Sequence, residues 1–327
     1  MFPYRYILAL ITMALLGVAL PSVAAPFAYF TNFSKSNTIT RYDEATSKTV
    51  AFNSAPDDSG YGPWGIAINK TGSVLYVTHT RKRMVAVLNA NTRQLITTIP
   101  VGGGPEGIAI TPDNKKLYVA NQDDSTVSVI STASNTVSKT IFGLVGPLGI
   151  AVNPAGTRAY VTNNYTQGSS VAVINTADDT IIKTIPVGLN PVGLVINSTG
   201  TRLYVANYNS NSVSVINTAT NAVIKSVNVG KGANGIAIHP SGKFVYVGNQ
   251  IDKNVVVIDT QTNAKIASIK DPVLRPYGLS TNPKGTRLYV SNCCCGYTGS
   301  VIDTRTHTLI STLDAGDTPI AFGQFVK

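Results

Sequence analysis

The sequence predicts an all-β fold, a seven-bladed β-propeller with four antiparallel strands in each blade. Three observations predict it. A Pro-x-Gly turn recurs at steps of 42 to 44 residues, a Tyr-Val motif recurs with the same period, and a valine-rich segment and a polar turn follow each motif. A repeat of about 40 to 50 residues that contains several short strands is typical of a propeller blade.

The Pro-x-Gly turns open the innermost strand of each blade, which we name strand A. Glycine and alanine follow the turn, and small residues suit a strand whose neighbours crowd around a central axis. The turns are Pro63-Trp64-Gly65, Pro105-Glu106-Gly107, Pro147-Leu148-Gly149, Pro191-Val192-Gly193, Ala233-Asn234-Gly235, Pro276-Tyr277-Gly278 and, with alanine last, Pro319-Ile320-Ala321.

The Tyr-Val motif marks strand B, and we expect its tyrosines to be core residues. They are Tyr29, Tyr76, Tyr118, Tyr160, Tyr204, Tyr246 and Tyr289. Asn closes the motif in all copies but one, where His79 replaces it, and we expect this Asn to bond the backbone of its own turn. Strand C is valine-rich, as in Val127 to Ile130, and strand D follows, as in Ile181 to Val187.

The two ends of the chain are predicted to share one blade. Strands B, C and D of the first repeat occupy roughly residues 27–52, and no strand A precedes them. We expect Ile320 to Phe325 to supply it, so that the C-terminal strand closes the ring by completing the N-terminal blade and leaves no orphan edge.

The strands LYVAN, AYVTN and LYVSN, with PxGIAI and VSVIDT at fixed spacing, resemble the YVTN family of seven-bladed propeller repeats. The resemblance covers the chain from Phe27 onward. It implies an exported or surface-associated binding or scaffold protein, and it carries no catalytic residue set.

The N-terminus is typical of a secretory signal peptide. Arg5 precedes an apolar run from Ile7 to Leu20, and small residues follow up to Ala25. We therefore expect a signal peptide over residues 1–25, one propeller domain over 26–327, and an exported protein, periplasmic or secreted. An uncleaved anchor helix is the alternative, and no other segment is long enough to span a membrane.

Strand alternation places the D–A and B–C loops on one face, at a predicted mouth of the central channel. The x residues of the turns vary around this mouth, and an aromatic ring with a few polar groups suits a ligand or protein partner. Our candidate binding residues here are Trp64, Glu106, Asn234 and Tyr277. The alternative is that they only pack on neighbouring loops.

The loop after Tyr76 concentrates positive charge near Trp64. It contains His79, Arg81, Lys82 and Arg83, in a chain of net charge +10. Cations that engage phosphates beside an aromatic ring favour an anionic polymer such as single-stranded nucleic acid. A solvated basic loop is the alternative, and the A–B turns on the opposite face are basic too.

Cys293, Cys294 and Cys295 are all the cysteines of the chain, and they lie in the last B–C loop. Thiolates suit a soft metal, Cu or Zn, or a redox role. A purely structural loop and an intermolecular bridge are the alternatives.

Together these observations favour a non-enzymatic binding or scaffold protein that uses the D–A and B–C face. A periplasmic metal- or redox-linked protein is the first alternative, and a polyanion-binding protein is the second. A lactonase-like hydrolase is disfavoured because Glu106 and Asn234 have no histidine beside them in the sequence, and no Gly-x-Ser-x-Gly or His-Glu-x-x-His motif is present.

Overall fold

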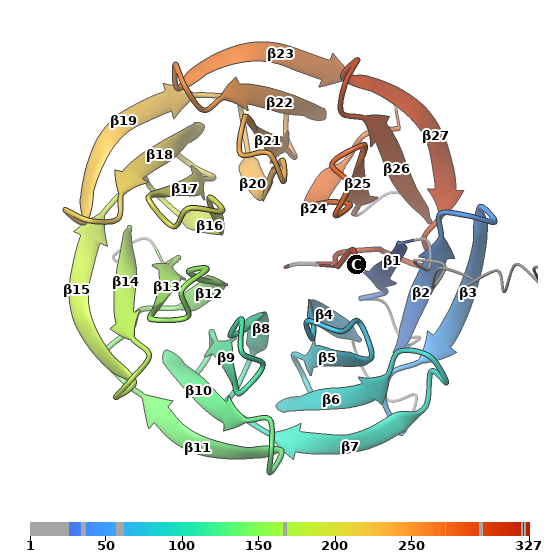
Figure 1. Ribbon diagram of the computed structural model, residues 1–327, viewed down its shortest axis with the longest axis vertical. Helices are drawn as coiled ribbons and strands as arrows, with labels where there is room; N and C mark the ends of the chain where they lie inside the picture. Colours follow the sequence, from blue (N-terminus) through green and yellow to red (C-terminus); the bar gives the residue numbers. More distant parts are fainter. Residues whose placement is uncertain are drawn as a thin grey trace, which may run out of the picture.

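The computed structural model describes residues 26–33, 37–56, 62–165, 169–271, 273–293, 297–321, 323 and 325–327. Its strands form seven antiparallel sheets arranged in a ring (Figure 1). The described residues contain no helix, and hence none that is long and apolar enough to cross a membrane. The predicted seven-bladed propeller is confirmed. The predicted signal peptide, residues 1–25, lies outside the described residues.

Each sheet is one blade, and its strands follow one another from the axis outward. Blade 1 contains β1 (Phe27–Thr31), β2 (Thr38–Asp43) and β3 (Lys48–Asn53). Blade 2 contains β4 (Pro63–Ile68), β5 (Val74–His79), β6 (Met84–Asn89) and β7 (Leu95–Pro100). Blade 3 contains β8 (Pro105–Ile110), β9 (Lys116–Asn121), β10 (Thr126–Ser131) and β11 (Thr136–Ile141). Blade 4 contains β12 (Pro147–Val152), β13 (Arg158–Asn163), β14 (Ser170–Asn175) and β15 (Thr180–Pro186).

The other three blades repeat this order. Blade 5 contains β16 (Pro191–Ile196), β17 (Arg202–Asn207), β18 (Ser212–Asn217) and β19 (Ala222–Asn228). Blade 6 contains β20 (Ala233–Ile238), β21 (Phe244–Asn249), β22 (Asn254–Asp259) and β23 (Ala264–Lys270). Blade 7 contains β24 (Pro276–Thr281), β25 (Arg287–Asn292), β26 (Thr298–Asp303) and β27 (Thr308–Asp314).

The motif tyrosines are buried between the strands on either side, as predicted. Tyr118 on β9 pairs with Ala109 on β8 and with Val129 on β10, and it is fully buried. Its hydroxyl donates to Asp179 Oδ1 in blade 4 at 2.5 Å, and Lys116 binds the other carboxylate oxygen at 2.7 Å. The Tyr118 ring therefore packs in the core of its own blade, and its hydroxyl joins blade 3 to blade 4.

The glycines of the Pro-x-Gly turns are required by the approach of the next repeat. A Cβ on Gly107 would collide with the carbonyl oxygen of Leu148 in blade 4. The same collision with the following repeat would occur at Gly65, Gly149, Gly193, Gly235 and Gly278. The innermost strands are thus spaced by backbone contact, which confirms the reason we gave for small residues there.

Side-chain hydroxyls join several neighbouring blades near the axis. Thr78 accepts the Gly65 N–H at 2.8 Å and donates to the Glu106 carbonyl of blade 3 at 2.7 Å. Thr162 makes the same pair of bonds with Gly149 and Val192, and Thr31 and Ser291 make corresponding bonds in blades 1 and 7. One hydroxyl therefore satisfies a buried N–H and a buried C=O from two blades.

The Asn that closes strand B bonds strand C, and this differs from our expectation of a bond to its own turn. Asn121 Nδ2 donates to the hydroxyls of Thr126 at 3.0 Å and Ser128 at 2.9 Å. Asn207 and Asn292 bond strand C hydroxyls in the same way. In these blades the partners are hydroxyl residues of strand C, whereas Asn249 donates to Asn254 Oδ1 of strand C and to the Val229 carbonyl.

The outer strands of blades 2 to 7 contain a β-bulge. The residue skipped in the pairing is an exposed isoleucine in five of them, namely Ile96, Ile182, Ile224, Ile266 and Ile310. A bulge disrupts the hydrogen-bond ladder and hinders edge-to-edge pairing with another chain.

The C-terminal segment lies beside β1, inside the ring (Figure 1). The Phe27 N–H donates to the Lys327 carbonyl at 2.7 Å, and the Tyr29 N–H donates to the Phe325 carbonyl at 2.8 Å. The described residues of this segment form isolated bridges, and the sheet of blade 1 contains three strands where we predicted four. The backbone explains the difference, because positive φ angles at Ala321 and Gly323 interrupt an extended strand.

Candidate functional site

At the D–A and B–C face, the central channel ends at a hydrophobic cluster, which we call the mouth cluster. It comprises Leu148, Val192, Cys293 and Ile320, with Phe33, Trp64, Tyr208 and Tyr277 packed against them. Five of these residues are x residues of the turns, and they come from blades 1, 2, 4, 5 and 7. Residues from blades that are not neighbours thus meet in one cluster at this end of the axis.

Trp64 and Tyr277, two of the predicted binding residues, lie in contact within the mouth cluster. Their ring centroids are 5.6 Å apart in an edge-to-face arrangement, and Phe33 packs on Trp64 at 4.7 Å. The Trp64 Nε1 atom is buried without a hydrogen-bond partner in the described residues. A buried donor of this kind gains from any acceptor that a ligand or an ordered water supplies.

Glu106 and Asn234 occupy the same turn position in blades 3 and 6. Both are buried, at 8% and 3% exposure. Burial raises the pKa of the Glu106 carboxyl to about 8, and the nearby Asp123 adds to the rise. The Asn234 Oδ1 atom has no hydrogen-bond partner among the described residues. Glu106 is therefore predominantly protonated at pH 7, where it can donate a hydrogen bond.

In the basic loop after β5, some of the predicted cationic side chains are buried or form ion pairs. His79 is fully buried at the end of β5, where it pairs with Pro63. Arg83 has a positive φ and forms an ion pair of 2.7 Å with Asp124 of blade 3. The Gly103 N–H, bonded to Asp124 at 2.7 Å, is the main cause of the lowered pKa of that carboxyl. Arg81 is exposed and Lys82 is half-buried in the same turn.

Only one of the three cysteines lies in the described part of the chain. Cys293 is buried in the mouth cluster, whereas Cys294 and Cys295 lie outside the described residues. Within the residues that the structure describes, no group of three or more His, Cys, Asp or Glu side chains is placed to hold a metal ion. Cu or Zn binding at the cysteine loop stays a prediction.

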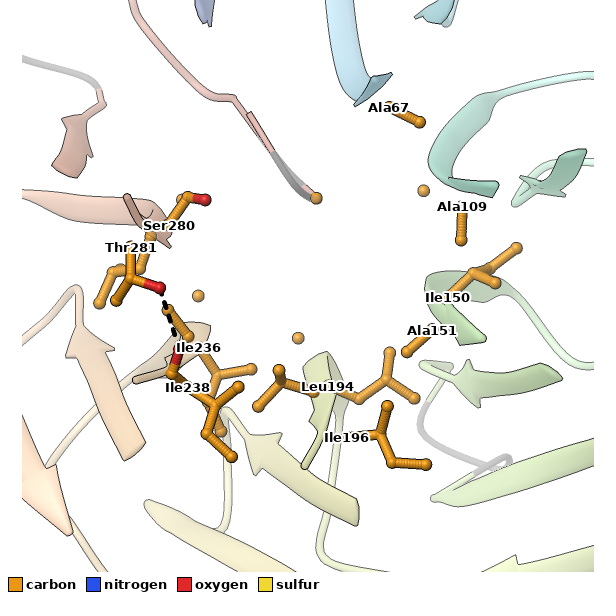
Figure 2. Close-up of a pocket in the computed structure, with 18 of the residues that line it drawn as sticks. Ala67, Ala109, Ile150, Ala151, Leu194, Ile196, Ile236, Ile238, Ser280 and Thr281 are labelled. Carbon is orange, nitrogen blue, oxygen red and sulfur yellow. Dashed lines mark hydrogen bonds between the residues drawn. The ribbon is translucent and has the colours of Figure 1, made fainter. Parts of the chain in front are cut away.

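The axis contains a cavity of about 470 Å³ that sequence reasoning missed (Figure 2). Its wall is made by strand A residues below the Pro-x-Gly turns, and it extends to the A–B turn residues Pro240, Asn282 and Pro283. The x residues of the turns are all described, and none of them lines it. The cavity thus lies beneath the mouth cluster and reaches the opposite face.

The two faces differ in exposed apolar residues. Large exposed hydrophobic side chains outside the strands lie only in D–A and B–C loops, within the described part of the chain. They are Phe142, Val145, Tyr165, Leu189, Ile251, Val273 and Tyr297. Phe142 is 72% exposed and Tyr297 is 63% exposed, so these side chains gain little from their own fold.

The model of the choice-of-anchor I domain family matches residues 28–253. No curated protein sequence matches the chain. Many solved structures have similar folds, and the three described next have identities that support the fold alone.

The first is the hydrazine synthase of Kuenenia stuttgartiensis, with 22% identity, a TM-score of 0.74, and coverage of 79% of this chain and 88% of that one. The second is a protein of unknown function from Desulfotomaculum acetoxidans, with 15% identity, a TM-score of 0.75, and coverage of 90% and 100%. The third is a putative 6-phosphogluconolactonase of Bacteroides fragilis, with 16% identity, a TM-score of 0.76, and coverage of 94% and 99%.

Proposed function

We propose that this chain, which belongs to the choice-of-anchor I domain family, is an exported or cell-surface binding protein that engages a partner protein through its D–A and B–C loops. The family description suggests the location, and a rigid ring with variable loops suits binding. The proposal depends on the family and on the loops of one face.

The observation that carries the proposal is the one-sided distribution of exposed apolar side chains. Exposed aromatic and aliphatic residues that gather on one face are typical of interaction surfaces, and aromatic residues are enriched in interface cores. Phe142, Tyr165 and Leu189 extend this surface across the loops of blades 3, 4 and 5. A protein partner is favoured over an anionic polymer because Arg83, a cation of the basic loop, is already paired with Asp124.

The loops that carry these residues are fastened to one another. Asn190 Nδ2 donates to the Asn164 carbonyl at 2.8 Å, and Asn209 Nδ2 donates to Asn190 Oδ1 at 2.5 Å. Tyr165 packs over Gly146, where a Cβ would collide with its ring. A surface that is already ordered loses little conformational entropy on binding, which favours affinity.

The test is capture of a partner by the immobilised protein from a cell-surface extract of the source cells, quantified by mass spectrometry. We expect Phe142→Ser and Leu189→Ser each to reduce capture of the main partner by about thirtyfold, as loss of an interface hot spot of roughly 2 kcal/mol does. Ile224→Ser is the matched control, because Ile224 is 46% exposed but lies on an outer strand. Unchanged capture by both loop variants would count against the proposal.

A further inference from the structure

Aliphatic side chains make up most of the wall of the axial cavity, and Ser280, Thr281, Asn282 and Lys327 add polar groups to it. Leu194, Ile196, Ile236 and Ile238 surround an open centre, with Ala67 and Ala109 across from them (Figure 2). A hydroxyl in the wall is already engaged, because Thr281 donates to the Ile238 carbonyl at 3.0 Å. A sugar or another polar ligand would leave hydroxyls without partners along the aliphatic part of this wall.

The shape of the cavity suits one extended chain. Its volume of about 470 Å³ is within the usual range of ligand pockets, about 300 to 1,000 Å³. It runs along six-residue strands, so its length is at most roughly 20 Å. The mouth cluster, which contains Trp64 and Tyr277, lies beyond one end, and the A–B turns surround the other.

Positive charge surrounds the end that the A–B turns form. Lys327 is the one charged residue among the described residues of the wall, and none of the described acidic groups forms an ion pair with it. Its backbone is held to Phe27 by hydrogen bonds in both directions, and its Cγ lies near Gly72. The A–B turns and the strand B residues that follow them add further cations around this end. These cations are Lys70, Lys115, Lys116, Arg158, Arg202, Lys243, Lys284 and Arg287. Three of them are paired with carboxylates, namely Lys115 with Asp113, Lys116 with Asp179 and Arg287 with Asp303, and Glu44 accepts hydrogen bonds from Asn282 of the wall.

We propose that the axial cavity is a binding site for a single-chain carboxylate amphiphile, a long-chain fatty acid. The apolar chain occupies the cavity with its methyl end toward the mouth cluster. The carboxylate lies at the A–B end beside Lys327, in the field of the surrounding cations. This site is separate from the proposed partner surface, because the D–A and B–C loops lie at the other end of the axis.

The first test needs no variant. Calorimetric titration of the unmodified protein with octanoate, decanoate and dodecanoate should give one site per chain, with affinity rising about fourfold for each added methylene. Decanol should bind about tenfold more weakly than decanoate, because it lacks the charge. Equal affinities along the series, preferential binding of glucose 6-phosphate, or no saturable binding would each overturn the proposal.

The second test uses Trp64, the single tryptophan of the chain, as a reporter of orientation. Trp64 lies in the mouth cluster, so 12-bromododecanoate should quench its fluorescence more than 2-bromododecanoate does. The reverse order would place the carboxylate at the wrong end and overturn the orientation.

Two variants locate the site. Ala151→Leu should fill the cavity and weaken dodecanoate binding at least tenfold, whereas Ala222→Leu on exposed β19 should not. Lys327→Met should weaken binding about tenfold and abolish the preference for decanoate over decanol, whereas Lys225→Met on the same outer strand should leave both unchanged. Thermal unfolding of each variant checks its fold, and wild-type binding by both cavity variants would overturn the proposal.

Discussion

Among the x residues of the turns, Glu106 is the one whose protonation depends most on its position in the ring. The same turn position holds Leu148 or Val192 in the next blades, and a carboxyl there pays a desolvation cost when it ionises. Burial is the first cause of its raised pKa, and the charge of Asp123 is the second. The folded protein therefore holds a proton that the unfolded chain releases at a lower pH.

This difference makes stability depend on pH with a definite sign. Between the ordinary pKa of 4.5 and the folded value of about 8, the folded state binds more protons, so the free energy of unfolding falls as pH rises. The loss is at most roughly 5 kcal/mol by pH 8.5. Urea unfolding at pH 5 and pH 8.5 should show this fall in the wild type and a much smaller one in Glu106→Gln. Asp123→Asn should move the window to lower pH, and equal falls in all three proteins would contradict the assignment.

The sequence identifies the exceptional residues of the turns but not where their side chains go. Trp64 and Tyr277 are in blades 2 and 7, and only the structure shows that the two rings meet beside Ile320 of the turn between them. His79 takes the place of an Asn that is itself buried in the other blades, so its burial could have been expected from the repeat. Cation and aromatic content alone do not reveal which side chains a folded loop leaves exposed, because pairs such as Arg83 and Asp124 form between blades.

At the scale of the strand, the repeat predicts the elements well because local pattern and packing agree. The Tyr-Val strands begin and end near the predicted places, and their tyrosines are buried. The residue before the closing Asn is Thr in some copies of the motif and Ala in others. This difference could have indicated that a hydroxyl at this position bonds the neighbouring blade. The partners of these hydroxyls are backbone groups of another repeat, and a one-dimensional pattern does not identify these.

The contact between innermost strands yields a stability prediction for Gly107. Gly107→Ala places a methyl group against the Leu148 carbonyl, and backbone must move to accommodate it. We expect a loss of about 3 kcal/mol in the free energy of unfolding, as overpacking of a rigid core causes. Gly242→Ala is the control, because its methyl group meets no atom within 4 Å and only its positive φ costs energy, about 1 kcal/mol. Urea unfolding measures both, and equal losses would show that blade spacing is not set by this contact.

At the scale of the molecule, the number of repeats in the sequence predicts the number of blades, but the repeats do not predict the shape of the channel. Five of the seven x residues at the predicted mouth gather in the mouth cluster, and the open space lies beneath it among Ile and Ala side chains. Which end of the central channel is closed by side chains depends on how far those side chains extend across the axis. That distance is set by the tilt of all blades together, and no single repeat encodes it.

The contact between the chain ends couples the first blade to the last residues of the sequence. Phe325 is fully buried, its ring lies 5.5 Å from that of Phe30, and both belong to the core cluster that includes Tyr289 of blade 7. Truncating it removes apolar contacts that join blade 1 to the C-terminal segment, which is also joined to β1 by backbone hydrogen bonds. We expect Phe325→Ala to lower the free energy of unfolding by about 3 to 5 kcal/mol.

Hydrogen exchange should localise this effect. The amides of Phe27 and Tyr29, which bond the C-terminal segment, should lose protection in Phe325→Ala before amides of the middle strands of blade 4 do, because the variant weakens packing only at this junction and local opening can then precede global unfolding. Phe142→Ala is the matched control, since that ring is 72% exposed and its loss should change stability by less than about 0.5 kcal/mol. If both variants unfolded at the same urea concentration, packing of the C-terminal segment would contribute nothing to the ring. If Phe325→Ala instead exposed all blades equally, the ring would open as one cooperative unit rather than from the junction of its ends.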